Sequence, residues 1–263
     1  MNDVPDTSPD SIPAEVPLPK VVNLPGAPKP LPVPPEARAI QRRIAELLDR
    51  LSRLEFFSCL DPRFLNQWLM VVSMADDYQR TIARHAGMTA ACSPGCAHCC
   101  FHWVEDVNSF EAEIIAAHIR REYPDHIPAL IDRCNRDSGM LERLNDLVEA
   151  KLATADPSDG ARKIDPVDLL LASFHRLRRQ CPLLDKKGGT CMVYQYRPLT
   201  CRMYVSFSSP SRCDPGHEGD HDVPTYLFDL EEPADGIIDA LHFKFLRFEG
   251  ITGLRPLLSR YLS

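Results

Sequence analysis

Cysteine is the residue type in this chain with the most specific chemistry, because eight of its ten cysteines fall into two groups. The first group places four cysteines within nine positions: Cys92, Cys96, Cys99 and Cys100. Gaps of two or three residues let one loop turn several sulfurs toward a single metal ion or cluster. The second group is more widely spaced: Cys181, Cys191, Cys201 and Cys213. The sequence therefore predicts that these eight cysteines are metal ligands.

Cys99 and Cys100 are adjacent in the chain, which distinguishes them from the other cysteines. Side chains of neighbouring residues tend to diverge, so they seldom bind one tetrahedral ion together. The doublet indicates either two adjacent metals or one ligand beside a thiol that supports it without binding the metal.

Two arginines, Arg197 and Arg202, flank Cys201. Thiolates concentrate negative charge, and a nearby guanidinium can donate charge-assisted hydrogen bonds to them and offset that charge. We expect at least one of the two arginines to support the bound cofactor in this way. Ordinary solvation at the surface is the alternative, because many exposed charged groups contribute nothing measurable.

The spacing leaves both zinc and iron open as the metal. Structural zinc sites usually draw two ligands from each of two Cys-x2-Cys pairs, and here Cys96 and Cys99 form the one such pair. Single cysteines ten or more residues apart, as in the second group, suit an iron–sulfur cluster as readily. Both metals accept thiolate ligands. The predicted cofactor is therefore zinc or iron, and the spacing slightly favours iron, including an iron–sulfur cluster.

The spacing Cys92-x3-Cys96-x2-Cys99 also occurs in radical S-adenosylmethionine enzymes, which hold a cluster with one open iron. Such an enzyme needs strands that alternate with helices after the motif. The sequence shows long helical patterns there instead, which disfavours this interpretation.

A second motif, His217-Glu218-Gly219-Asp220-His221, satisfies H-E-x-x-H, the zinc-protease signature. That chemistry requires a helix that aligns both histidines. Prolines and glycines crowd this segment, so the helix is not expected. His217 and His221 are left as either additional ligands or solvated loop residues.

The remaining cysteines, Cys59 and Cys134, fall inside or beside helical apolar stretches, where free cysteine commonly behaves as a small buried hydrophobe. We therefore exclude both from the metal site. Three histidines on predicted helices lack a second nearby ligand and are interpreted as packing or surface residues: His118, His175 and His242.

Apolar periodicity indicates the elements that position these residues. Helices are predicted at 36–54, 61–86, 108–121, 127–152, 166–180 and 237–262. The first two form a helical hairpin before the cysteines, and the segment 87–103 lacks periodicity, so it is predicted to be a loop. A Gly188-Gly189 turn between short apolar runs predicts a small β-hairpin at 181–194. The predicted fold class is mainly α with a small β-hairpin.

Composition indicates how the chain is organised. A chain of 263 residues with 44% hydrophobic side chains can bury one sizeable core, so we predict a single helical domain over 36–263. Residues 1–35 hold 11 of the 24 prolines and are predicted to form a disordered tail, through which an unknown protein partner could bind. The net charge of −7 argues against a nucleic-acid partner.

The expected cellular compartment is inferred from two features that the sequence does not show, a membrane-spanning segment and a secretory signal. The sequence contains no run of about 18 apolar residues, which is the length that a membrane-spanning helix needs. Residues 1–13 are acidic and proline-rich and do not have the basic and apolar regions of a secretory signal. We therefore expect a cytoplasmic protein, in which cellular reductants keep thiols free. Metal binding then explains the ten cysteines better than disulfides do.

The cysteine segments resemble the YkgJ-like cysteine-cluster proteins, a family described as zinc- or iron-chelating. The resemblance rests on 92–100, on Cys-Pro-Leu-Leu at 181–184, and on 191–202 with its Tyr194 and Arg197-Pro198. It covers about half of the chain, roughly 90–213. It implies eight cysteine ligands and an unsettled metal, without an established reaction. Flagellin lysine methylase is a distant relative of this kind, which keeps an enzyme interpretation open.

These observations favour a metal-binding protein that chelates zinc or iron through eight cysteines, with no reaction assigned. The alternative is an iron–sulfur-dependent redox or methyl-transfer enzyme related to flagellin lysine methylase. That alternative needs a substrate pocket and a general base, which spacing alone does not identify. A third interpretation is a scaffold that binds partners through its proline-rich tail.

Overall fold

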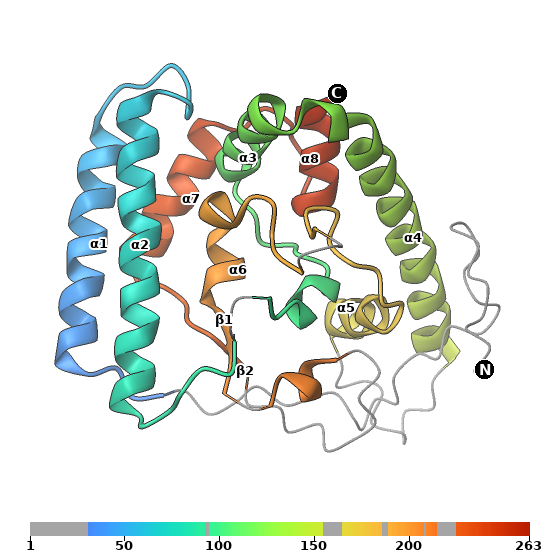
Figure 1. Cartoon of the computed structure of the whole chain (residues 1–263), viewed down its shortest axis with the longest axis horizontal. Coiled ribbons are helices and arrows are strands. Elements are labelled where there is room, and N and C mark those ends of the chain that lie inside the picture. Colours follow the sequence, from blue (N-terminus) through green and yellow to red (C-terminus); the bar gives the residue numbers. More distant parts are fainter. Residues whose placement is uncertain (1–30, 93–94, 155–164, 186–188, 208, 215–224) are drawn as a thin grey trace.

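The computed structural model describes residues 31–263 apart from 93–94, 155–164, 186–188, 208 and 215–224 (Figure 1). The longer helices are α1 Pro35–Arg53, α2 Pro62–His85, α3 Ser109–Glu122, α4 Ile127–Thr154, α5 Pro166–Arg176, α7 Ala234–Lys244 and α8 Leu254–Leu262. The shorter elements are η2 His98–Phe101, η3 Pro124–His126, η6 Tyr194–Tyr196, α6 Leu199–Met203, β1 Tyr204–Ser206, η7 Pro210–Cys213 and β2 Thr225–Leu227. The chain is mainly α with a small β element, which confirms the predicted fold class.

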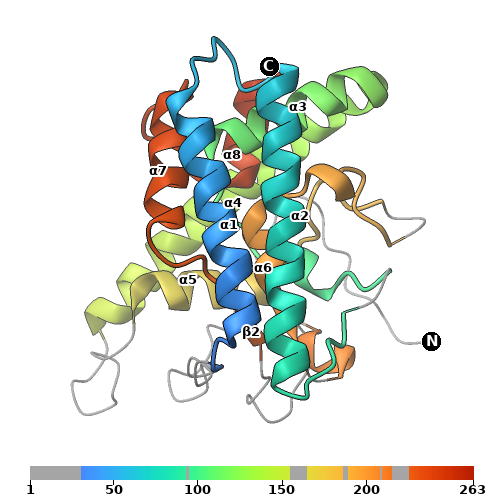
Figure 2. The same ribbon diagram turned by 90° about the vertical axis from the view of Figure 1, so that its left-hand side faces the viewer.

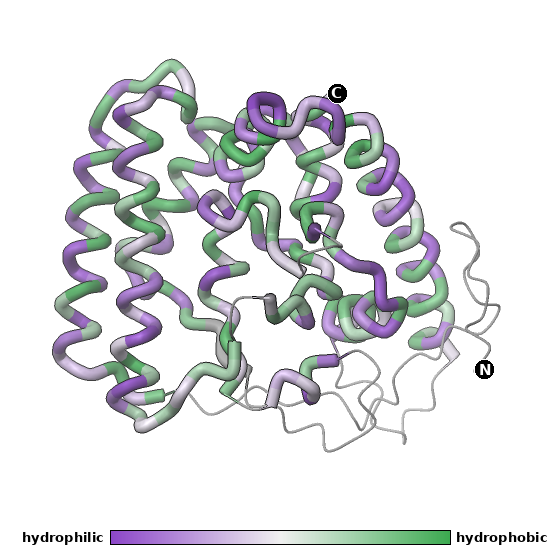
Figure 3. Tube along the Cα trace, viewed as in Figure 1, coloured by the Kyte–Doolittle hydropathy of each residue, from purple (hydrophilic) through white to green (hydrophobic). Residues whose placement is uncertain are grey.

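The predicted helical hairpin is formed by α1 and α2, which lie side by side in both views (Figures 1 and 2). Hydrophobic and hydrophilic residues alternate along both helices, so each turns an apolar stripe inward (Figure 3). Asp61 caps α2, because its carboxylate accepts a hydrogen bond from Arg63 N at 2.8 Å. Gly87, with a φ of 67°, follows the helix end.

A first core joins the hairpin to α7 and to the start of α3. Aromatic rings meet edge to face in it: the Phe64 ring centre lies 4.9 Å from that of Phe245 and 5.7 Å from that of Phe110. Leu31 and Val33, at the start of the described chain, also pack against this core. The hairpin and α7 thus form one apolar unit at one side of the molecule (Figure 1).

A second core lies among α3, α4 and α8. Three residues of the cysteine segments belong to it: Cys181, Leu183 and Val193. The cysteine segments therefore pack between the two cores, with α6 next to the hairpin and α5 next to α4 (Figure 1).

The start of α3 links the helices to the second cysteine group. Its N-terminal Glu111 accepts hydrogen bonds from Asn108 N at 3.1 Å and from Leu199 N at 2.8 Å. The first bond belongs to a capping box, which satisfies free N–H groups at the helix start. The second fixes the start of α6, which carries Cys201.

Two predicted helices end earlier than their periodicity indicates. The segment 237–262 is two helices, α7 and α8, because Gly250 and Gly253 take φ values of 73° and 81° that an α-helix cannot accommodate. The helix predicted to reach Gln180 ends at Arg176, and Arg178 takes a left-handed φ of 53° just beyond it.

In the described residues of 181–194, the predicted β-hairpin reduces to one antiparallel bridge between Leu184 and Cys191. Leu184 N donates to Cys181 O in a turn, and Tyr194 enters η6, so little extended chain remains on either side. The two-stranded antiparallel sheet lies elsewhere and pairs β1 with β2, from Tyr204 opposite Leu227 to Ser206 opposite Thr225.

Some predictions fall on residues outside the described part of the chain. These are most of the proline-rich tail (1–30) and the H-E-x-x-H segment with His217 and His221. In the described residues, no helix has both the length and the apolar character that crossing a membrane requires.

Candidate metal centre

The first cysteine group lies on a loop that ends in η2. Ala91 N donates to Ser206 O at 2.8 Å, which attaches the start of the loop to β1. At its other end, Cys100 N donates to Ala97 O at 2.9 Å, and the tight turn brings Cys99 and Cys100 next to the second group. The described residues of this segment contain turns and no α-helix, as the lack of periodicity predicts.

The second cysteine group follows a turn whose two arms carry Cys181 and Cys191. Met192 N donates to Leu183 O at 2.9 Å and holds the arms together. Gly189 has a φ of 62°, and a Cβ atom there would lie 3.3 Å from Gly95 O in the first loop. Glycine therefore permits both the turn and its close approach to the first cysteine group.

Cys201 lies in α6, and Cys213 is the last residue of η7. Two contacts bring the two cysteine groups together. Cys181 N donates to Cys100 O at 2.6 Å. Asp214 Oδ2 lies 3.7 Å from His98 Nδ1, so the end of η7 meets η2.

Backbone N–H groups donate hydrogen bonds to three of the sulfurs: Ser206 N to Cys92 Sγ, Leu183 N to Cys181 Sγ, and Val193 N to Cys191 Sγ. The Ser206 side chain also forms a hydrogen bond with Cys213 Sγ. Such bonds favour the charged thiolate and tune a metal or cluster that the sulfurs bind. The loops are thus built to support negative charge on sulfur.

Burial and neighbouring thiols act in the opposite direction. Burial raises the pKa of Cys191 to about 11, and the charge of Cys181 contributes to the rise. The pKa of Cys201 is raised by burial and then by the charges of Cys181, Cys99 and Cys191. These mutual effects arise because the thiols lie within electrostatic range of one another. A bound cation would reverse them, because it stabilises the thiolate.

The side chains of Cys99 and Cys100 do not diverge as their adjacency suggests, but form a hydrogen bond. This bond lowers the pKa of Cys99 to about 7, and the charge of Arg197 adds to the effect. The same bond raises the pKa of Cys100. Cys100 therefore donates to the Cys99 thiolate.

No group of three or more His, Cys, Asp or Glu side chains in the described part of the chain is already arranged to hold a metal ion. The donor set nonetheless fits zinc or iron by its chemistry, because thiolates suit both metals and N–H groups support their charge. Metal binding would have to draw these sulfurs together, which couples binding to the ordering of both loops.

Residues 91–218 match the family model CxxCxxCC, described as a "putative zinc- or iron-chelating domain". Residues 91–218 are thus similar to this family, and we name them the CxxCxxCC domain after it. The matched residues include all eight predicted ligands and confirm the family resemblance. No curated protein and no solved structure matches the chain. The family supports zinc or iron chelation.

Of the two predicted arginines, Arg197 is the one whose charge acts on Cys99, Cys191 and Cys201. It opposes the rise in the pKa of Cys191 and of Cys201 and helps to lower that of Cys99. Its guanidinium lies 4.4 Å from the ring centre of Tyr194. Arg197 Nε is buried and has no hydrogen-bond partner among the described residues. Its contact with a cofactor stays a prediction, which this placement supports.

Arg202 pairs with the hairpin instead. Its Nη1 lies 2.9 Å from Asp76 Oδ2 on α2, and its Nη2 donates to the carbonyls of Tyr194 and Gln195. Arg202 is buried, so these bonds are shielded from water. It fixes the segment between Cys191 and Cys201 against α2. For Arg202, a role in cofactor binding stays a prediction.

A buried ion-pair network connects the two cysteine groups to α4 and α8. Asp137 on α4 accepts hydrogen bonds from Arg179 Nε and, at 3.0 Å, from Arg255 Nε on α8. Arg255 also donates to His102 O at 3.3 Å and to Arg179 O at 3.4 Å. These carbonyls lie just after the first cysteine group and just before the second. Sequence reasoning missed the network, because its partners are far apart in the chain.

Two histidines beside the first cysteine group stack face to face. The rings of His102 and His175 are 3.9 Å apart with an interplanar angle of 6°. Burial lowers the pKa of His102 to about 4 and that of His175 to about 3. His98 Nδ1 and His175 Nε2 are buried and lack hydrogen-bond partners among the described residues. The sequence pattern, which places His175 on a helix, contains no signal for this stack.

Cys59 and Cys134 are both fully buried. Cys59 lies in the turn between α1 and α2 and belongs to the first core. Cys134 lies in α4 and belongs to the second core. Burial raises its pKa to about 12, and the charge of Cys181 contributes. That neither cysteine is a metal ligand stays a prediction. Cys134 is the closer of the two to the site, because the charge of Cys181 acts on it.

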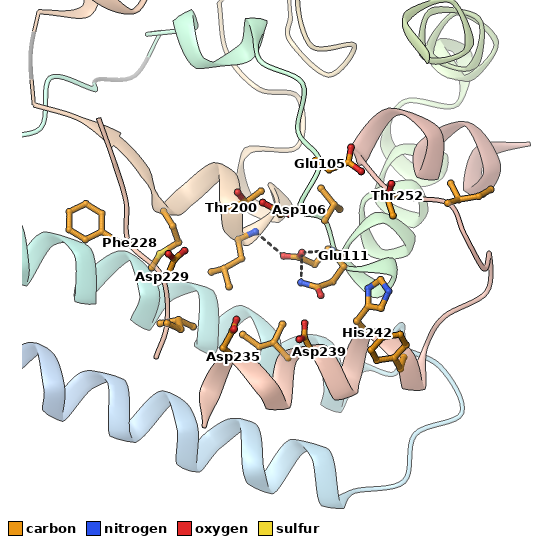
Figure 4. A pocket seen from close by; sticks show the side chains of 18 residues that line it. Glu105, Asp106, Glu111, Thr200, Phe228, Asp229, Asp235, Asp239, His242 and Thr252 are labelled. Carbon is orange, nitrogen blue, oxygen red and sulfur yellow. Dashed lines mark hydrogen bonds between the residues drawn. The ribbon is translucent and has the colours of Figure 1, made fainter. Parts of the chain in front are cut away.

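A cavity of about 570 Å³ lies beside α6, on which Thr200 lines it directly before Cys201 (Figure 4). Six carboxylates line it: Glu105, Asp106, Glu111, Asp229, Asp235 and Asp239. Lysine and arginine are absent from its lining in the described part of the chain. Buried apolar side chains, including Met203 and Phe228, form part of its wall. Sequence reasoning identified no such pocket.

Proposed function

We propose that the CxxCxxCC domain binds zinc or iron through thiolates of both cysteine groups, and that the metal holds the two groups together. The ligands are the eight cysteines Cys92, Cys96, Cys99, Cys100, Cys181, Cys191, Cys201 and Cys213. The observation that carries this proposal is the junction at Cys100 and Cys181, where the two groups share a 2.6 Å backbone hydrogen bond. N–H groups aimed at sulfur on both sides of that junction support it.

The pKa values of the metal-free thiols explain why a metal would matter here. Burial raises the pKa of Cys181, Cys191 and Cys201, so without a cation these thiols stay protonated near neutral pH. A divalent metal replaces those protons and binds the thiolates. Its binding free energy then stabilises loops that contain little regular structure.

An iron–sulfur cluster is the finer form of this proposal. The widely spaced second group is typical of cluster ligands, and buried sulfurs with N–H donors suit a cluster as well as a zinc ion. Zinc would give a colourless protein, whereas a cluster absorbs visible light. The function requires a compartment that keeps thiols reduced, which agrees with the expected cytoplasmic location.

Anaerobic purification of the full chain, followed by metal analysis and a visible absorption spectrum, tests the proposal. We expect at least one equivalent of zinc or iron per chain. The Cys181→Ser variant should lose most of it, because a hydroxyl is a far poorer donor to these metals than a thiolate.

The matched control is Cys59→Ser, which changes a cysteine that we exclude from the ligand set. It should keep its metal, and its stability should change little, because the Cys59 thiol donates a hydrogen bond to Glu113 that a serine hydroxyl can also form. A folded wild-type protein with eight free thiols and no metal would contradict the proposal. Equal metal loss from Cys59→Ser and Cys181→Ser would contradict the ligand assignment.

The cavity beside α6 favours one second candidate, an iron–sulfur-dependent redox or methyl-transfer enzyme whose substrate occupies it. Glu111 lies at the cavity wall and binds Leu199 N, two residues before Cys201. The test is electron paramagnetic resonance before and after chemical reduction of the anaerobic protein. A centre that changes oxidation state supports the enzyme, and a protein that contains zinc alone excludes it.

A further inference from the structure

We infer that the eight cysteines form two adjoining centres of four thiolates each, and that each centre takes cysteines from both sequence groups. The metal binding proposed above is a precondition of this arrangement. The outer centre comprises Cys92, Cys96, Cys99 and Cys213. The inner centre comprises Cys100, Cys181, Cys191 and Cys201. The sequence order suggests instead one set at 92–100 and another at 181–213.

The number of ligands supports a division into two. Structural zinc ions bind four ligands in a tetrahedron, and iron–sulfur clusters are also typically held by four cysteines. A single centre of either kind would leave four of the eight thiols without a metal. Two centres use all of them.

Ser206 defines the outer centre. Its carbonyl accepts from Ala91 N at 2.8 Å, its N–H donates to Cys92 Sγ, and its side chain forms a hydrogen bond with Cys213 Sγ. Ser206 is buried, and its backbone and side chain hold Cys92 and Cys213 next to the same residue of β1. Cys213 comes from the second sequence group and Cys92 from the first. The 3.7 Å approach of Asp214 to His98 fixes η7 against the same loop.

The inner centre forms around the junction of the two groups. Cys181 N donates to Cys100 O at 2.6 Å, which places the second residue of the doublet beside the first thiol of the later group. The bridge between Leu184 and Cys191 pairs the two arms of the turn, one of which carries Cys181 and the other Cys191. Cys201, on α6, lies within reach of the charges of Cys181, Cys99 and Cys191.

The doublet separates the two centres. Cys96 and Cys99 act on Cys213, whereas Cys100 is affected first by Cys99 and then by Cys181 and Cys191. Cys99 also acts on the inner thiols, so it lies at the boundary. Because Cys99 and Cys100 are hydrogen-bonded, the two centres must adjoin.

Cadmium-113 NMR of the cadmium-substituted wild-type protein tests this arrangement without any mutation. Cadmium binds thiolates as zinc does, and its chemical shift reports how many sulfurs surround it. We expect two cadmium ions per chain and two resonances, each typical of a four-sulfur site. One ion per chain with one resonance would overturn the two-centre arrangement and leave the proposed function standing. No binding at all would remove both.

Native mass spectrometry of zinc-loaded variants tests which cysteine belongs to which centre. Cys213→Ser and Cys191→Ser should each reduce the count from two ions to one, and the double variant should bind none. Cys59→Ser should keep two. If the double variant still retained one ion, both substitutions would lie in the same centre, and the assignment would be wrong. Circular dichroism checks that each variant retains its helices.

Discussion

The helical hairpin is held together by different interactions from the cysteine region, which comprises the cysteine segments at 90–103 and 181–213. α1, α2 and α7 share an apolar core in which aromatic rings meet edge to face. The cysteine region contains short turns, and its segments are joined by backbone hydrogen bonds and by the buried pair of Asp137 and Arg255. The first arrangement follows from local apolar periodicity and needs no ligand. The second depends on links between distant residues, so a metal would contribute most there.

The largest expected difference between the two regions appears when the metal is removed. A strong chelator under reducing conditions should unfold the cysteine segments at 90–103 and 181–213, because metal-binding energy is folding energy where regular structure is sparse. α1 and α2 should stay folded. Hydrogen exchange followed by mass spectrometry measures both regions in one experiment. Equal protection in the cysteine region before and after chelation would contradict this difference.

Breaking the buried ion pair should have the next largest effect. Asp137→Ala leaves Arg255 buried and unpaired, which should cost about 3–5 kcal/mol of unfolding free energy. The matched control, Asp77→Ala, removes the exposed pair with Arg80 on α2 and should cost less than about 1 kcal/mol. Urea denaturation measures both variants. Similar costs would mean that the buried pair does not hold the cysteine region.

A smaller effect concerns pH. Burial lowers the pKa of His175 from 6.5 to about 3 in the folded protein. Above pH 6.5 the imidazole is neutral in both states, so its contribution to stability is constant. Between pH 6.5 and about 3 the unfolded chain binds a proton that the folded chain does not. Stability therefore falls as the pH falls, by at most about 1.4 kcal/mol per pH unit.

The His175→Gln variant should show a shallower loss of stability over this pH range than the wild-type protein. Thiol titration affects both proteins equally and cancels in their difference. His126→Gln, at an exposed position, is the matched control and should follow the wild-type curve. Parallel curves for His175→Gln and the wild type would show that His175 is not buried in its neutral form.

The smallest effect is expected at the start of the chain. Deleting residues 1–30 should leave metal content and melting temperature nearly unchanged, because a proline-rich tail buries little. Replacing Leu31 and Val33 by alanine in the shortened chain should cost about 1–2 kcal/mol, since both pack against the first core. Thermal denaturation compares the shortened chain with and without these two substitutions. Loss of metal on deletion alone would show that the tail contributes to the site.

The same difference between the regions explains what could be predicted from the sequence. The hairpin was predictable because its signals are local: apolar spacing, Asp61 before Pro62, and Gly87 after the helix. The end of α5 and the break between α7 and α8 were not predicted. They depend on left-handed residues at Arg178, Gly250 and Gly253, which periodicity does not report.

In the candidate site, residue type and spacing predicted the loop and the family, and the match over 91–218 confirms the family. Spacing could not predict that Ser206 would hydrogen-bond both Cys92 and Cys213, because that contact depends on where β1 lies. Nor could it predict the cavity beside α6, whose walls come from segments far apart in the chain. The Ser206 contacts and the cavity both depend on packing between residues far apart in the chain, and a single sequence does not show which distant residues pack together.

X-ray absorption at the metal edge of the anaerobically purified protein is the sharpest test of metal binding by the eight cysteines, because it identifies the metal and the atoms bound to it. We expect zinc or iron with a shell of four sulfur neighbours, at about 2.3 Å for zinc. The Cys59→Ser protein should give the same spectrum. A shell made mainly of nitrogen and oxygen, or a folded protein without bound metal, would contradict binding by the eight cysteines.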